Sequence, residues 1–228
     1  MKIFLDFDDV IFDTKRFIDD RDQIFLDNNI APEIFNKYPN DYSLKRKQGE
    51  LVKYSDKEHL ESLRDVLDNN VDFEKLRKEI SELIKDAEKY VFKEFYDFAE
   101  KIGKENLFLL SYGDVKHQTE KVKNSGIMDY FADIIITDGL KSEALSKKLL
   151  ADNNEICYFI DDRITHLEDV KKQFPKIKTF LMASGDGRYK DDIKDKERID
   201  KYCDDVVKNF AEVEKLLEQN GELKKSCV

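Results

Sequence analysis

MKIFLDFDDVIFDT, residues 1–14, places two carboxylates, Asp6 and Asp8, directly after a short apolar run. Acids are unfavourable at the end of a buried strand, because strands disfavour Asp and an unpaired buried carboxylate is costly. Residues i and i+2 at the end of an extended strand point the same way, so both carboxylates can face one metal ion or one phosphoryl group. A divalent cation is the simplest group that would offset the cost of burying them.

Residues 6–10, DFDDV, resemble the first motif of the haloacid dehalogenase-like superfamily, which reads Asp-x-Asp-x-Thr/Val at the end of strand one. Residues 11–14, IFDT, resemble the usual continuation of that motif. The resemblance implies that further motifs follow in order, each at the end of a later strand.

The part of the chain after this motif is helical in pattern. From Thr14 to about Lys104, apolar residues recur at helical spacing, and no convincing strand is found. The longest apolar stripe covers residues 73–102, with Asp72 as its N-cap and Gly103 as its stop. A stripe of that length is long for a globular helix, so we allow for a break within it.

Beyond residue 104, short unbroken apolar runs alternate with helical stretches, and unbroken runs are typical of strands covered on both faces. The sequence therefore predicts an α/β protein with a parallel sheet and right-handed crossovers. The expected strands cover residues 107–110, 134–136, 156–160, 179–182 and, more weakly, 206–207. The expected helices cover residues 115–124, 142–152, 166–173 and 210–219.

This layout resembles the same superfamily, whose Rossmann-like core often carries a helical cap inserted just after the first motif. The resemblance implies two domains. Residues 1–14 and 105–228 would form the core, and residues 15–104 would form the all-helical cap.

The ends of the later strands carry residues that match further motifs of the superfamily. Ser111 and Tyr112 follow the second strand, where the resemblance implies binding of phosphoryl oxygens through the serine hydroxyl and neighbouring backbone N–H groups. Lys141 follows the third strand and is our choice for the lysine that neutralises the phosphoryl group, with Lys116 as a rival.

The fourth strand ends in Asp161 and Asp162, which resemble the motif that supplies magnesium ligands. The more familiar form of that motif has a second acid four or five residues later, but His166 and Leu167 occupy those positions here. The chain must therefore use the paired form. Mg²⁺ needs only one or two carboxylates beside water and substrate. This departure from the familiar form leaves open whether Asp161 or Asp162 is the direct ligand, and we favour Asp162.

The resemblance implies a covalent mechanism in which Asp6 attacks phosphorus to form an aspartyl-phosphate. Mg²⁺, held by Asp6, the backbone carbonyl of Asp8 and Asp162, would bridge the nucleophile and the phosphate. Asp8 would protonate the leaving alkoxide and then deprotonate the hydrolytic water. Ser111 and Lys141 would hold the phosphoryl oxygens.

The sequence thus predicts magnesium-dependent hydrolysis of a small phosphorylated metabolite, with the cap selecting the substrate. Asp8 argues against a dehalogenase, because the resemblance implies that dehalogenases lack an acid at this position. A phosphomutase and a binding module with little catalysis stay open as alternatives.

Composition restricts the partners and the compartment. The net charge of −10 argues against binding to nucleic acids or anionic membranes, which requires basic surfaces. No apolar run approaches the roughly 20 residues of a membrane span, and Asp6 interrupts the N-terminal run before a secretory leader could form. The three cysteines lack metal-ligand spacing and fit a reducing compartment, so we expect a cytoplasmic protein.

Overall fold

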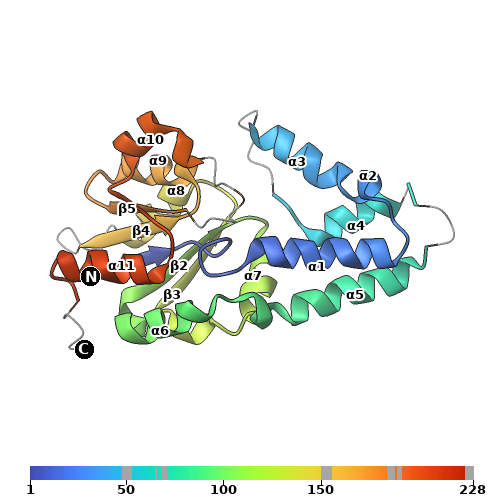
Figure 1. Cartoon of the computed structure of the whole chain (residues 1–228), viewed down its shortest axis with the longest axis horizontal. Coiled ribbons are helices and arrows are strands. Elements are labelled where there is room, and N and C mark those ends of the chain that lie inside the picture. Colours follow the sequence, from blue (N-terminus) through green and yellow to red (C-terminus); the bar gives the residue numbers. More distant parts are fainter. Residues whose placement is uncertain are drawn as a thin grey trace.

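The computed structural model describes residues 1–47, 53–64, 66–67, 71–149, 156–183, 188 and 192–223. A six-stranded sheet forms the centre, in the order β3-β2-β1-β4-β5-β6, and every pair of neighbouring strands is parallel (Figure 1). The predicted α/β fold is therefore confirmed. The strands are β1 (Lys2–Leu5), β2 (Leu107–Tyr112), β3 (Asp133–Thr137), β4 (Cys157–Asp161), β5 (Lys178–Met182) and β6 (Asp205–Val207).

The first strand occupies the middle of the sheet and is covered on both faces. Ile3, Phe4 and Leu5 are fully buried, which explains their unbroken apolar pattern. Leu5 is in register with Leu109 of β2 and with Ile160 of β4. This register brings the residues that follow these three strands to one edge of the sheet.

Helices cover both faces of the sheet. On one face α6 (Lys93–Ile102), α7 (Val115–Asn124) and α11 (Phe210–Gln219) contribute to the larger apolar cluster. On the other face α8 (Lys141–Leu149), α9 (Ile164–Gln173) and α10 (Lys196–Tyr202) enclose a second cluster. The expected end of the eighth helix, residues 150–152, lies outside the described residues. Short 3₁₀ turns complete the described core: η2 (Lys104–Asn106), η3 (Met128–Tyr130) and η4 (Asp192–Lys194).

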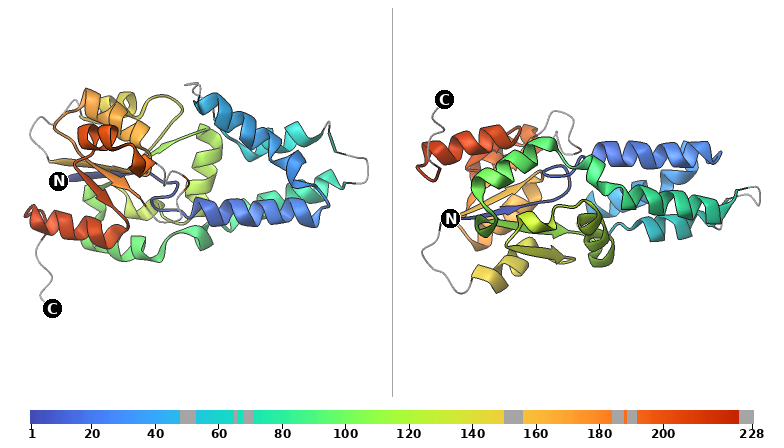
Figure 2. Two further views of the ribbon diagram at one scale, coloured as in Figure 1. Left: turned by 45° about the horizontal axis from the view of Figure 1, so that its top comes forward. Right: turned by 90° about the horizontal axis from the view of Figure 1, so that it is seen from below.

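A helical unit stands beyond the carboxyl ends of the strands, as the views in Figure 2 show. It begins where Asp13 caps α1 by accepting a hydrogen bond from the backbone N–H of Arg16. It has an apolar cluster of its own, which includes Phe25, Phe35 and Leu76. Its helices are α1 (Thr14–Asp27), α2 (Pro32–Phe35), α3 (Lys37–Lys47), α4 (Asp56–Arg64) and α5 (Phe73–Lys85).

The long apolar stripe at residues 73–102 is broken, and its two halves pack in different places. After α5 the chain forms η1 (Ala87–Tyr90), and α6 then packs on the sheet, where the rings of Phe98 and Phe210 stack with centroids 4.6 Å apart. Residues 93–102 thus pack on the sheet, whereas the sequence placed residues 15–104 in the cap. We propose that the cap ends between residues 86 and 92.

Both connections between cap and core run side by side. The backbone N–H of Phe92 donates to the carbonyl of Ile11, and that of Asp13 donates to the carbonyl of Tyr90. The chain therefore leaves and re-enters the core at a single paired crossing. Among the described residues, no helix combines the length and the apolar character needed to cross a bilayer.

Candidate active site

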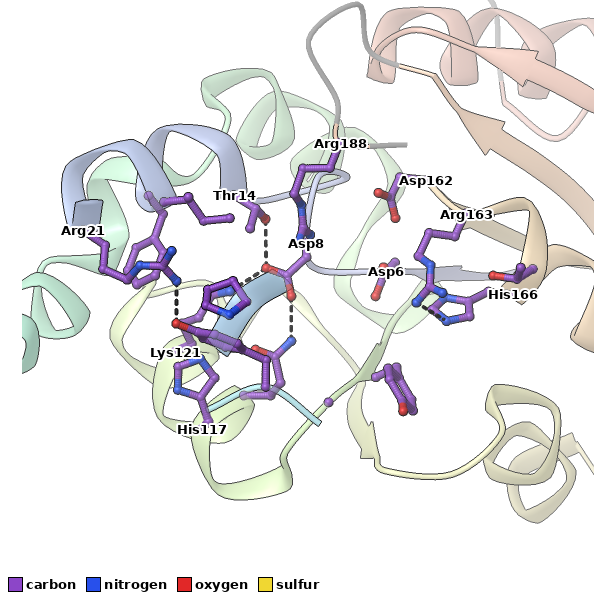
Figure 3. A pocket seen from close by; sticks show the side chains of 18 of the residues that line it. Asp6, Asp8, Thr14, Arg21, His117, Lys121, Asp162, Arg163, His166 and Arg188 are labelled. Carbon is purple, nitrogen blue, oxygen red and sulfur yellow. Dashed lines mark hydrogen bonds and ion pairs between the residues drawn. The ribbon is translucent and has the colours of Figure 1, made fainter. Parts of the chain in front are cut away.

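A cavity of about 650 Å³ lies at the carboxyl ends of the central strands, where parallel α/β sheets usually bind ligands. The strand ends contribute Asp6, Asp8 and Asp162, and Figure 3 shows these three carboxylates around a common space. The cap closes the opposite side with α1, through residues such as Arg21. The helix α7 forms a third wall.

Asp6 sits one residue beyond β1, with its backbone N–H bonded to the carbonyl of Ile160. Its Oδ1 lies 2.7 Å from Nζ of Lys141, the first residue of α8, and both side chains are buried. Lys116, the rival lysine, is exposed to solvent on α7. Burial raises the pKa of Asp6 to about 7, because desolvation and the charge of Asp161 outweigh the opposing charge of Lys141.

Asp161 is fully buried, and surrounding donors satisfy its carboxylate. Nζ of Lys141 lies 2.6 Å from Oδ2, and the backbone N–H of Arg163 donates to Oδ1 at 2.9 Å. Nδ1 of His166 lies 3.0 Å from Oδ2. Burial alone would raise the pKa of Asp161, but His166 and Lys141 together lower it well below its ordinary value.

Asp162 differs sharply from its neighbour. Its side chain is 5% exposed, and its Oδ2 atom has no hydrogen-bond partner among the described residues. Burial, together with the charges of Asp161, Asp9 and Asp6, raises its pKa well above the ordinary value. A buried carboxylate with an unsatisfied oxygen is costly, and a bound cation would remove that cost.

These carboxylates fit a magnesium ion. Oxygen atoms of Asp6 and Asp162 at one sheet edge are the hard ligands that Mg²⁺ prefers. Ligand atoms of Asp6, Asp161 and His166 also lie within 4.8 Å of one another. However, the ammonium of Lys141 contacts both Asp6 and Asp161 and already provides the positive charge in that group. The unsatisfied oxygen of Asp162 makes that residue the better candidate ligand.

Asp8 is held by three hydrogen-bond donors. Lys121 lies 2.5 Å from Oδ1 through Nζ, and Thr14 donates to the same oxygen at 2.9 Å. Gln118 donates to Oδ2 at 2.7 Å. Burial by itself would raise the pKa of Asp8, but the charges of Lys121 and Arg188 and the hydrogen bonds from Lys121 and Gln118 lower it well below its ordinary value. Asp8 is therefore a carboxylate anion in this arrangement.

Ser111 and Tyr112 are the last two residues of β2, whereas the sequence placed them just after this strand. Ser111 is fully buried, and its Oγ accepts a hydrogen bond of 2.9 Å from Gln118. Tyr112 lines the cavity and is half-buried, with its ring centroid 5.7 Å from that of His166. A Cβ at Gly113 would lie only 2.8 Å from Cγ of Gln118, so this close approach favours glycine.

The cap wall of the cavity includes both apolar and polar side chains. Arg21 is 4% exposed, and its guanidinium bonds to Asp22 at 2.8 Å and to the hydroxyl of Tyr54 at 2.5 Å. Nδ1 of His117, on the core helix α7, lies 3.7 Å from Oδ2 of Asp56 in the cap. His117 therefore lies where the helical unit meets the sheet domain.

Four residues that our sequence analysis missed line the cavity and contact the expected site residues: Gln118, Lys121, Arg163 and His166. Three of them lie within helices, and Arg163 is the N-cap of α9, so the strand-end motifs did not single them out. The available signal is their position: Gln118 and Lys121 are three apart on the helix that follows Ser111 and share one face.

No protein-family model and no curated protein matches this chain. Solved structures do. A haloacid dehalogenase-like hydrolase from Burkholderia xenovorans is 19% identical with a TM-score of 0.70, and the match covers 92% of this chain and 96% of that one. The HAD-hydrolase YfnB from Bacillus subtilis, bound to magnesium, is 14% identical with a TM-score of 0.65, and covers 95% and 98%.

L-2-haloacid dehalogenase from Xanthobacter autotrophicus is also similar, at 14% identity and a TM-score of 0.59, covering 96% of this chain and 98% of that one. The chain therefore has the haloacid dehalogenase-like fold, as its motifs predicted. The match extends over the cap as well as the core, because nearly the whole of each chain is covered.

Proposed function

We propose that this protein is a magnesium-dependent phosphatase of small phosphomonoesters, with Asp6 as nucleophile and Asp8 as general acid and base. One observation carries the proposal. Two carboxylates follow the central strand and line one cavity, with a buried lysine on Asp6 and three donors on Asp8. The hydrolases that share the fold support a hydrolytic reaction.

In the first step a carboxylate oxygen of Asp6 bonds to phosphorus as the bond from phosphorus to the leaving alkoxide breaks. Asp8 gives its proton to that alkoxide. In the second step Asp8 takes a proton from water, whose oxygen attacks phosphorus and releases Asp6 and inorganic phosphate. Lys141 and the donors at Ser111 and Tyr112 stabilise the charge on the phosphoryl oxygens.

The protonation state of Asp8 has to change during this cycle. Lys121 and Gln118 hold it as an anion, which suits its role as a base. The acid step requires a proton on Asp8. The arriving dianionic phosphate favours that proton, because nearby negative charge raises the pKa of a carboxyl group.

We propose that Asp6, Asp162 and the backbone carbonyl of Asp8 hold the magnesium ion, whereas Asp161 orients Lys141. When bound, Mg²⁺ would neutralise charge so that an anionic nucleophile can approach an anionic phosphate. We infer a cytoplasmic enzyme, and Cys157 and Cys203, which form no disulfide among the described residues, support a reducing compartment.

The test measures phosphate release from a panel of phosphomonoesters and an aryl phosphate, with Mg²⁺ and with chelator. We expect magnesium-dependent turnover that falls about a thousandfold or more in Asp6→Asn, because the nucleophile is lost. Asp97→Asn, an exposed position on α6, is the matched control and should behave like wild type.

Several outcomes would contradict the proposal. Turnover that survives the loss of Asp6 would exclude it as nucleophile. Halide release from a 2-haloacid in place of phosphate release would identify a dehalogenase, in which Asp8 has no proton to supply. Phosphate binding without turnover on any ester would favour the binding module.

A further inference from the structure

The helix that follows Ser111 presents two polar side chains to the end of the sheet where Asp6 and Asp8 lie. The helix α7 starts at Val115, and its N-cap Asp114 accepts a hydrogen bond from the backbone N–H of His117. Gln118 and Lys121 follow on one face and are 3% and 4% exposed. Buried polar side chains need hydrogen-bond partners, and both Gln118 and Lys121 donate to the carboxylate of Asp8.

The amide of Gln118 bridges two residues from different strand ends. Its Nε2 donates to Oδ2 of Asp8 at 2.7 Å and to Oγ of Ser111 at 2.9 Å, so each of its two hydrogens has an acceptor. A carboxylate only accepts hydrogen bonds, which fixes the amide orientation. Since the Oγ of Ser111 accepts from Gln118, this hydrogen bond does not use the hydroxyl hydrogen of Ser111.

The position of the Gln118 side chain is tightly defined. Its Cγ lies where a Cβ at Gly113 would come within 2.8 Å, so the turn after β2 packs directly on it. A side chain of similar length without polar hydrogens would keep this packing and lose only the two hydrogen bonds. Packing and hydrogen bonding can therefore be separated by substitution.

Lys121 fixes the other oxygen of Asp8. Its Nζ lies 2.5 Å from Oδ1 and 5.2, 4.6 and 5.4 Å from the ring centroids of Phe7, Phe12 and Phe17. This aromatic surround holds the ammonium by cation–π attraction. Asp8 is therefore fixed from one side by Lys121 and from the other by Gln118.

We propose that Gln118 is a positioning residue that couples proton transfer by Asp8 to phosphoryl binding by Ser111. One amide hydrogen orients the Asp8 carboxylate for proton transfer, and the other makes the Ser111 hydroxyl a donor to the phosphoryl group. This role rests on the proposed phosphatase function. It predicts that a single substitution at position 118 weakens both phosphoryl binding and leaving-group protonation.

The test compares Gln118→Met, which keeps the length of the side chain, with wild type. Calorimetry with inorganic phosphate in Mg²⁺ buffer reports the Ser111 hydrogen bond, and we expect about tenfold weaker affinity. Values of kcat/KM for an alkyl phosphate and for nitrophenyl phosphate report proton transfer from Asp8. The alkoxide leaving group needs a proton from Asp8, whereas nitrophenolate leaves without one. We expect about a hundredfold loss for the alkyl ester and about tenfold for the aryl ester.

Matched variants separate coupling from damage to the fold. Glu120→Gln, exposed on the same helix, should leave phosphate affinity and the alkyl-to-aryl ratio unchanged. In a Ser111→Ala background, Gln118→Met should no longer affect phosphate affinity but should still lower the alkyl-to-aryl ratio. Gln118→Glu, of nearly the same shape, replaces both donor hydrogens and should reproduce both losses if Gln118→Met does not fold.

Two results would overturn the proposal. One is unchanged phosphate affinity and an unchanged alkyl-to-aryl ratio in a folded Gln118→Met protein. The other is an undiminished effect on phosphate affinity after Ser111 has been removed. If wild type hydrolyses no ester, the proposed function fails by itself, while phosphate calorimetry still decides whether Gln118 acts through Ser111. Wild type that neither binds phosphate nor turns over would overturn both.

Discussion

Nζ of Lys141 lies 2.7 Å from Oδ1 of Asp6, and both side chains are buried. The same ammonium lies 2.6 Å from Oδ2 of Asp161. It is thus a shared counter-ion that joins the start of α8 to the ends of β1 and β4. Burial alone would lower the pKa of Lys141, but the two carboxylates raise it above its ordinary value, so the lysine stays charged.

Removal of this counter-ion should destabilise the fold. In Lys141→Met two buried carboxylates lose their positive partner, and we expect about 3–5 kcal/mol less stability towards urea unfolding at pH 7.5. Lys141→Met combined with Asp161→Asn should recover part of that loss, because one buried negative charge is gone. An unfolding midpoint equal to that of wild type in Lys141→Met would show that the ion pair adds no net stability.

Metal binding should stabilise the protein through Asp162. We expect Mg²⁺ to raise the melting temperature of wild type, with a gain of about 2.7 kcal/mol at a hundred times the dissociation constant. Asp162→Asn should lose this response, and its metal-free form should melt higher than that of wild type because a buried unsatisfied carboxylate is removed. Asp161→Asn should keep a magnesium response. The reverse pattern would identify Asp161 as the ligand.

A buried histidine in the cap should make stability depend on pH. Burial and the charge of Arg21 lower the pKa of His59 from 6.5 to about 4, and its ring nitrogens bond to the hydroxyl of Tyr54 and the carbonyl of Phe35. The folded-state pKa is depressed, so the unfolded chain binds the proton more readily. The contribution of His59 is therefore complete above pH 6.5 and is lost as the pH falls towards 4.

Urea unfolding at pH 7.5 and pH 4 would measure this contribution. Relative to His59→Gln, wild type should lose up to about 3 kcal/mol over that range. Equal pH dependence in the two proteins would mean that His59 accepts its proton as readily in the folded state as in the unfolded chain.

The proposed boundary between cap and core predicts that two substitutions change stability and hydrogen exchange in different parts of the chain. Phe98→Ala removes the ring that stacks on Phe210 and should cost about 3–5 kcal/mol, with faster hydrogen exchange in the sheet. Leu76→Ala opens the cap cluster and should accelerate exchange in α1 and α5. If Phe98→Ala instead accelerated exchange in the cap alone, α6 would belong to the cap.

The sequence predicted the sheet well because buried parallel strands leave a local signal. The unbroken apolar runs before Asp6, Ser111 and Asp161 mark three neighbouring strands. Helical stretches separate these runs along the chain, which favours parallel strands joined by crossover connections. The break after Lys85 and the packing of α6 on the core were harder to predict. Apolar spacing shows that a face is buried but not which partner buries it.

The acids at the carboxyl ends of the strands were visible from the sequence alone, because a carboxylate at the end of an apolar strand conflicts with its surroundings. Their separate environments were decided by the tertiary structure. Lys141, His166 and a backbone N–H satisfy Asp161, whereas one oxygen of Asp162 has no partner among the described residues. Charge and hydrogen bonding act through space, so two adjacent aspartates that are alike in sequence acquire opposite pKa shifts and different proposed roles.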